Sequence, residues 1–188
     1  MQPINPVDAL TMIAQKLDAA AIPYMLTGSV AALFYGRDRS TVDMDIIVDM
    51  RGRSAAQLAA ALGGDYYFDA EAGDESFRRG RMYNALPLAG GPKIDFIPLT
   101  DQPFEQTKFQ RRVIKDWHGT PIAVIRAIDL AISKLQWATE SRSERQLADV
   151  RAILSFGEVE ADDYFYGWVE RLGLQEAMEA SRETRYDA

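Results

Sequence analysis

Apolar residues recur along the chain with two different spacings, which predicts helices interleaved with strands. Near the N-terminus, Leu10, Ile13, Ala14 and Leu17 follow helical spacing, and Pro23 ends that pattern. Strands are predicted at 24–27, 42–48, 66–68, 81–88, 93–99, 113–117 and 121–124, and helices at 28–36, 54–62, 71–79 and 104–110. A mixed α/β region is therefore expected up to residue 125.

From residue 126 onward the pattern is only helical. Two apolar stripes are predicted there, one through Ile128, Ala131, Ile132 and Leu135 and one through Leu147, Val150 and Leu154. Polar-faced helices are expected over 162–172 and 174–185. We thus predict an α/β (α+β) protein with two domains. Residues 1–125 form a core with a small mixed β-sheet flanked by helices, and residues 126–188 form a C-terminal helical region packed on that core.

Composition narrows the chemistry that such a protein can perform. The chain of 188 residues has no cysteine and a single histidine, His118, which excludes thiolate ligands and a site with several histidines. Any metal ion must therefore be held by oxygen. The net charge of −7 argues against a long polyanion as the main partner. No apolar run is long enough to span a bilayer and no secretory signal is evident, so we expect a cytoplasmic protein without a membrane partner.

Three aspartates interrupt apolar strands. Asp43 and Asp45 are two residues apart on the strand predicted at 42–48, so their side chains point to the same face and can share a metal ion. A strand with one wet face is the alternative explanation. Asp95 stands between apolar residues on a later strand, where a charge is costly unless a cation binds it or the strand is an edge facing water.

Gly28 and Ser29 lie where a strand passes directly into a helix. Glycine lets the backbone approach a phosphate closely, and the amides that open a helix point toward an anion. A plain helix start is the alternative. The combination of this turn with the three acids is more informative than any of its parts.

Together the motifs Leu26-Thr27-Gly28-Ser29, Asp43-Met44-Asp45 and Ile94-Asp95-Phe96 resemble those of the DNA polymerase beta-like nucleotidyltransferase superfamily. The segments 37–41 and 129–135 make the chain similar to bacterial stand-alone members, which include abortive-infection-type toxins. The resemblance implies a nucleotidyltransferase fold and places catalytic metal ligands at Asp43, Asp45 and Asp95.

The same resemblance implies contacts to a nucleoside triphosphate, made by Gly28, Ser29, Arg39, Thr41 and Lys134. A solvated surface position is the alternative for Lys134. Asp149 matches a further acid of the family, but its helical phase places it opposite the predicted apolar stripe, so we leave it out of the catalytic set.

The implied reaction is attack by an acceptor hydroxyl on the α-phosphorus of the nucleotide with pyrophosphate leaving, and two Mg²⁺ (or Mn²⁺) ions stabilise the entering and leaving oxygens. Transfer RNA, a protein and a small molecule all remain possible acceptors. A partner protein, as in a toxin–antitoxin or phage-defence system, is also compatible. The competing hypothesis is a catalytically silent module that binds a nucleotide or a partner on the same fold.

Overall fold

A computed structural model describes residues 4–36, 43–156 and 161–183 of the chain. The chain forms two compact units, of which the first comprises Met1–Val30 and Ser40–Val124 and the second Ala31–Arg39 and Ile125–Ala188. The break after Val124 lies close to the predicted domain boundary. The segment Ala31–Arg39, in contrast, groups with the helical unit, although its place in the sequence would assign it to the core.

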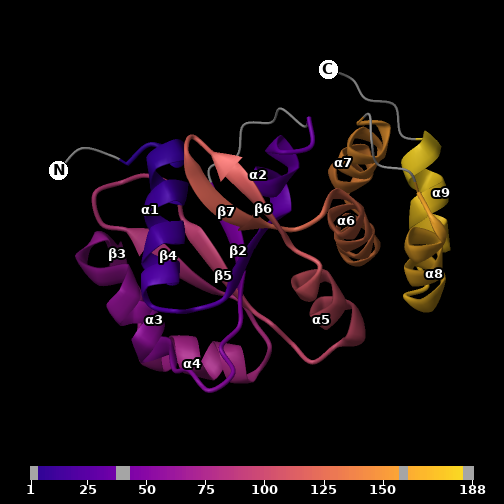
Figure 1. Ribbon diagram of the computed structural model, residues 1–188. Helices are drawn as coiled ribbons and strands as arrows, with labels where there is room; N and C mark the ends of the chain where they lie inside the picture. Colours follow the sequence, from indigo (N-terminus) through magenta and orange to yellow (C-terminus); the bar gives the residue numbers. More distant parts are fainter. Residues whose placement is uncertain (1–3, 37–42, 157–160, 184–188) are drawn as a thin grey trace. The chain divides into compact units, whose positions relative to one another are not determined.

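The first unit is built on a seven-stranded sheet with the strand order β3-β4-β5-β2-β1-β7-β6 (Figure 1). The strands are β1 (Tyr24–Thr27), β2 (Met44–Val48), β3 (Tyr66–Tyr67), β4 (Tyr83–Pro87), β5 (Ile94–Pro98), β6 (Val113–Trp117) and β7 (Thr120–Val124). β2 is antiparallel to β1 and parallel to β5, which is in turn antiparallel to β4. The small mixed sheet flanked by helices, expected from the sequence, is confirmed.

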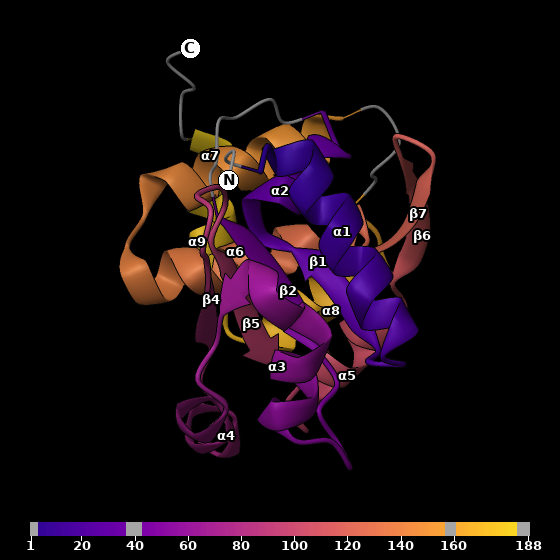
Figure 2. The same cartoon turned by 90° about the vertical axis from the view of Figure 1, so that its left-hand side faces the viewer.

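Among the described residues of this unit, the helices of eight or more residues are α1 (Pro6–Ala19), α3 (Ala55–Leu62), α4 (Ala70–Arg78) and α5 (Pro103–Gln110). Asn5 caps α1 by accepting a hydrogen bond from the Asp8 amide at 2.9 Å, and Pro6 starts the helix at a position where its missing N–H is not needed. The predicted apolar residues of α1 are all buried. α1 and α3 lie side by side over one face of the sheet (Figures 1 and 2).

The boundaries of two elements differ from the prediction in ways that affect the site. β2 begins at Met44, so Asp43 immediately precedes the strand instead of lying on it. α2 (Gly28–Leu33) has only six residues and ends before Gly36. β5 lies between β2 and β4, so Asp95 is not on an edge strand and is 6% exposed.

The second unit contains α6 (Ala127–Ser141), α7 (Glu144–Ser155), α8 (Asp163–Arg171) and α9 (Gln175–Glu183). α6 is its centre because it contacts each of the other three helices. The Tyr35 hydroxyl donates a 2.6 Å hydrogen bond to the Ile125 carbonyl, which ties the segment after α2 to the start of this unit. Within the described ranges, every helix is too short or too polar to cross a membrane.

Candidate functional site

A row of polar residues runs across four neighbouring strands of the first unit. Thr27 of β1 pairs in register with Asp45 of β2, which pairs with Asp95 of β5, which pairs with Asn84 of β4. Residues opposite one another in a sheet point to the same face, so these four side chains form one line. The register of the sheet therefore brings Asp45 and Asp95 together although they are far apart in the sequence.

The turn that follows Thr27, at the start of α2, accepts only glycine. Gly28 has a φ of +66°, and a Cβ atom placed on it would lie 1.9 Å from Oδ2 of Asp45. A side chain would therefore clash with the carboxylate as well as strain the backbone. Gly28 allows Asp45 to approach the backbone at the start of α2, beside the half-buried Ser29.

Lys93 contacts two of the predicted metal ligands. Its ammonium group donates a 3.0 Å hydrogen bond to Oδ2 of Asp95 and lies 3.5 Å from Oδ2 of Asp43. Burial by itself would lower the pKa of Lys93. The hydrogen bond and charge of Asp95, together with those of Asp43, outweigh that effect and raise the pKa, so the side chain stays charged.

Asp95 is the most buried of the three predicted acids and is incompletely satisfied. Its Oδ2 accepts the bond from Lys93, while its Oδ1 is buried and has no hydrogen-bond partner in the described part of the chain. A buried carboxylate oxygen without a donor is costly in a folded protein. Such an atom is a candidate ligand for a cation.

The carboxylate oxygens at and beside this row are ligands that a hard divalent ion prefers. Within residues 4–36, 43–156 and 161–183 no three Asp, Glu, His or Cys side chains stand close enough to form a metal site. Mg²⁺, however, is commonly bound by one or two carboxylates together with substrate phosphates. Asp43 and Asp95, which already share one cation, can supply two such carboxylates. The three-aspartate ligand set stays a prediction.

Lys134, expected to contact nucleotide phosphates, is engaged inside the second unit. Its ammonium group donates to Oδ2 of Asp149 at 2.7 Å and to Oε1 of Gln146 at 3.0 Å. The side chains of Lys134 and Asp149 are only 4% and 1% exposed. The alternative of a solvated surface lysine is therefore wrong, and a contact with nucleotide stays a prediction.

The interpretation of Asp149 from helical phase was also wrong. The buried residues of α7 are Asp149, Val150 and Ile153, whereas Leu147 and Leu154 are only half-buried. The buried face is thus rotated from the predicted stripe, and α7 turns Asp149 toward Lys134 of α6. Lys134 stands at the flank of the apolar stripe of α6, and its pairing with Asp149 depends on how the two helices pack.

Two predicted nucleotide contacts, Arg39 and Thr41, lie outside the described residues. Sequence reasoning missed Lys93 and Asn84. The signal for Lys93 was its position two residues before Asp95, which places both side chains on one face. No local signal pointed to Asn84, because its place beside Asp95 depends on the register of β4 and β5.

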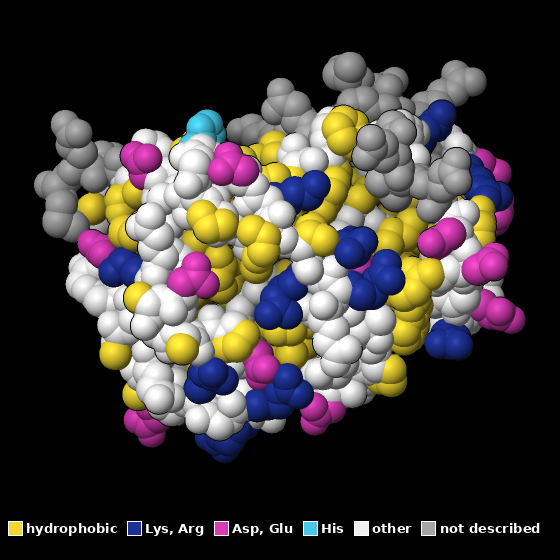
Figure 3. Space-filling view, viewed as in Figure 1, with side chains coloured by type: hydrophobic (Ala, Val, Ile, Leu, Met, Phe, Trp, Pro, Cys, Tyr) yellow, Lys and Arg dark blue, Asp and Glu magenta, His cyan; other side chains and the backbone are white. Residues whose placement is uncertain are grey.

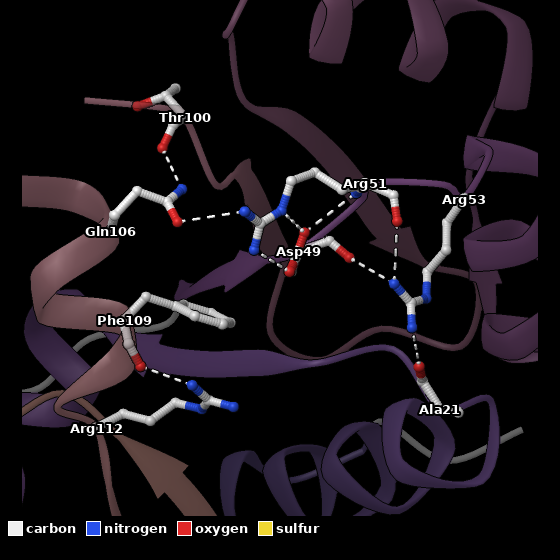
Figure 4. A network of polar contacts seen from close by, with 8 residues as sticks. All are labelled: Ala21, Asp49, Arg51, Arg53, Thr100, Gln106, Phe109 and Arg112. Atoms are coloured by element: carbon white, nitrogen blue, oxygen red, sulfur yellow. Dashed lines mark hydrogen bonds and ion pairs between the residues drawn. The ribbon is translucent and has the colours of Figure 1, made fainter. Parts of the chain in front are cut away.

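A second polar network lies beyond the opposite end of β2 (Figure 4). The guanidinium group of Arg51 donates two hydrogen bonds to Asp49, Nε to Oδ1 at 2.9 Å and Nη2 to Oδ2 at 2.6 Å. The Arg51 hydrogen bond is the main reason why the pKa of Asp49 lies below its usual value. Arg53 donates to the carbonyls of Asp49 and Ala21, so this network holds loops together and differs from the open acid row.

Charges of both signs are spread over the molecular face in Figure 3. The net charge of −7 therefore does not describe each local surface. The charged groups at and beside the row are the carboxylates of Asp43, Asp45 and Asp95 and the ammonium group of Lys93.

Comparison with known proteins rests on structure alone. No protein-family model matches the sequence, and no curated protein matches it. The antibiotic-resistance factor ANT(2″)-Ia matches in solution structure with a TM-score of 0.59 and 14% identity, over 94% of this chain and 96% of that one. An antigenic nucleotidyltransferase-like protein from Paracoccidioides brasiliensis matches with a TM-score of 0.53 and 16% identity, over 97% and 94%.

The chain has the nucleotidyltransferase fold. A crystal structure of ANT(2″)-Ia in complex with adenylyl-2″-tobramycin agrees, with a TM-score of 0.56 and 16% identity, over 88% of this chain and 98% of that one. The fold predicted from the motifs is thereby confirmed. At such low identities the likeness concerns the fold, so activity has to be argued from the site.

Proposed function

We propose that the protein is a Mg²⁺- or Mn²⁺-dependent nucleotidyltransferase that moves a nucleoside monophosphate from a nucleoside triphosphate to an acceptor hydroxyl. The observation that carries this proposal is the row Thr27–Asp45–Asp95, with Gly28 packed against Asp45 at one end. A phosphate-accepting turn and hard oxygen ligands then meet on one face of a sheet. Phosphoryl transfer depends mainly on such positioning and charge stabilisation.

Each part of the row has a role in this proposal. Gly28 and Ser29 seat the triphosphate through the backbone amides that open α2, and the lack of a side chain at Gly28 leaves room for Asp45 beside this turn. Asp43, Asp45 and Asp95 hold the divalent cation, which supplies the positive charge that stabilises the entering and leaving oxygens. Asp95 lies next to the acceptor and helps to remove its proton.

In this proposal the order of the strands separates the side of the sheet that binds the triphosphate from the side that the acceptor approaches. The turn for the phosphates follows β1, whereas Asp95 and Asn84 lie on β5 and β4. The acceptor therefore approaches from the side of β4. In this proposal Asn84, which neighbours Asp95 on this face, contacts the acceptor.

The test is transfer of label from each of the four α-labelled nucleoside triphosphates, with Mg²⁺ or Mn²⁺, to cell extract, to RNA or to hydroxylated small molecules. The adenylylated tobramycin bound to ANT(2″)-Ia makes aminoglycosides the first small acceptors to try. Wild-type protein should transfer label, and Asp95→Asn should lose about a thousandfold or more of the rate, because an essential ligand and base is neutralised.

Asp65→Asn is the matched control, since Asp65 also pairs with a lysine, Lys16, at 3.0 Å in the same unit. It should retain the wild-type rate. Equal loss in both variants, or transfer by the double variant Asp43→Ala/Asp45→Ala, would refute the assignment of the site.

Lys93 favours one alternative, a catalytically silent module that binds a nucleotide or a partner protein. Its ammonium group already neutralises part of the charge of Asp43 and Asp95. Metal-dependent binding of nucleotide without transfer in the same assay would establish that alternative. The resemblance to abortive-infection-type proteins supports, as a further proposal, a bacterial toxin–antitoxin or phage-defence role.

A further inference from the structure

If the proposed function holds, Lys93 lies where the divalent ion has to bind. Its ammonium group is in contact with Oδ2 of Asp95 and within ion-pair distance of Oδ2 of Asp43. These carboxylates are the ones that the proposed reaction needs for a divalent ion. A lysine cation and a metal ion cannot both occupy the space in contact with the same two oxygens.

The backbone holds Lys93 at this place. Lys93 immediately precedes β5, and its carbonyl oxygen accepts a 3.0 Å hydrogen bond from the Met44 amide, next to Asp43. Lys93 and Asp95 are two residues apart and so share a face of the sheet. The side chain is 30% exposed, which leaves its flexible stem room to move toward solvent.

Lys93 satisfies only one of the two carboxylate oxygens of Asp95. One ammonium group satisfies Oδ2, while Oδ1 stays buried without a partner among the described residues. A divalent ion carries twice the charge and can bind both oxygens of a carboxylate or bridge between carboxylates. The lysine is therefore an incomplete substitute for the metal.

We propose that Lys93 is a tethered cation that competes with the divalent ion for Asp43 and Asp95. The nucleotide-free protein then binds divalent ions weakly. A nucleotide brings phosphate oxygens as additional ligands and offers the displaced ammonium group a new anionic partner. Binding of metal is thereby coupled to binding of nucleotide. Without nucleotide, the protein takes up few free divalent ions.

The experiment measures Mn²⁺ binding to the full chain without nucleotide, by isothermal titration calorimetry and by electron paramagnetic resonance of free Mn²⁺. Lys93→Met should bind Mn²⁺ about tenfold or more tightly than wild type, because one competing charge is removed. Lys16→Met is the matched control, since Lys16 pairs with Asp65 and is similarly half-buried, and its Mn²⁺ affinity should equal that of wild type.

Lys93→Arg separates charge from folding. It keeps the competing cation, so its Mn²⁺ affinity should stay near the wild-type value, and adding Asp95→Asn to Lys93→Met should abolish the gain. Thermal melting of each variant checks that it is folded. Unchanged or weaker Mn²⁺ binding by folded Lys93→Met would overturn the proposal, as would the same gain in Lys93→Arg.

These results are distinguishable from those of the transfer assay. Label transfer by wild type, with no effect of Lys93→Met on Mn²⁺ affinity, would refute the competition alone. Tighter Mn²⁺ binding by Lys93→Met without transfer by any form would support the competition and refute the transferase. Absence of Mn²⁺ binding in every form, with or without nucleotide, would refute both.

Discussion

Each of the two units contains a lysine paired with aspartate, and the two clusters differ in how completely they are satisfied. In the second unit Lys134, Asp149 and Gln146 form a closed cluster whose charged side chains are almost fully buried. In the first unit Lys93 is shared between half-exposed Asp43 and buried Asp95, and one oxygen of Asp95 has no partner within the described residues.

The difference shows how lysine and aspartate can stabilise a fold in one place and remain available for a ligand in another. A buried pair with complete hydrogen bonding is held in one arrangement, because separating the charges would leave each unsatisfied. A partly exposed lysine between two acids can be replaced by another cation at small cost. The proposed function uses the first cluster for substrate chemistry, whereas the burial and pairing of the second show that it contributes to the packing of the helical unit.

The sharpest test of this contrast is Lys134→Met. It leaves Asp149 buried without its ammonium partner and should lower the free energy of unfolding by about 3–5 kcal/mol, measured by urea denaturation. The double variant Lys134→Met/Asp149→Leu should recover most of that loss, since the buried carboxylate is removed together with the ammonium group. A loss below about 1 kcal/mol in the single variant would contradict a structural role.

Gly28→Ala tests how closely Asp45 and the turn are packed. The added Cβ would overlap Oδ2 of Asp45, and the residue would hold a φ of +66°. We expect a loss of about 1–3 kcal/mol of stability together with loss of label transfer, because Asp45 must move. Gly64→Ala is the control, since a Cβ there meets no atom within 4 Å, and it should change neither property.

Asp49 offers an intermediate case, a carboxylate bound tightly by Arg51 at the far end of β2. Its folded-state pKa is lowered, so its contribution to stability is present above the unfolded value of 3.8 and is lost as the pH falls through the folded-state pKa. Asp49→Asn should cost about 1 kcal/mol at pH 7. Urea denaturation should show this difference between variant and wild type shrinking below about pH 4, and a difference independent of pH would contradict the ion pair as its source.

The smallest effect on stability is expected for Asp95→Asn. The variant removes an incompletely satisfied buried charge and leaves half-exposed Lys93 close to Asp43, so the free energy of unfolding should change by less than about 1 kcal/mol. The comparison with Lys134→Met would fail if Asp95→Asn were destabilising to a similar degree. A stable variant without label transfer would show that Asp95 serves chemistry.

Much of the fold could be predicted because periodicity and turn residues are local. The helix with Leu10, Ile13 and Leu17 and the mixed sheet follow from spacing alone. Boundaries were less accurate, as Asp43 precedes β2 and α2 is short. The face that α7 buries could not be predicted, because it depends on Lys134 of a different helix.

The candidate site, too, could be predicted only in part. The motifs by themselves predicted the fold and made Asp45 and Asp95 candidate site residues, since an acid within an apolar strand is costly and therefore informative. Only the tertiary structure decided that these acids are opposite each other, that Lys93 and Asn84 stand beside Asp95, and that Lys134 pairs with Asp149. Register and packing join residues that are distant in sequence, and no local pattern encodes which partners will meet.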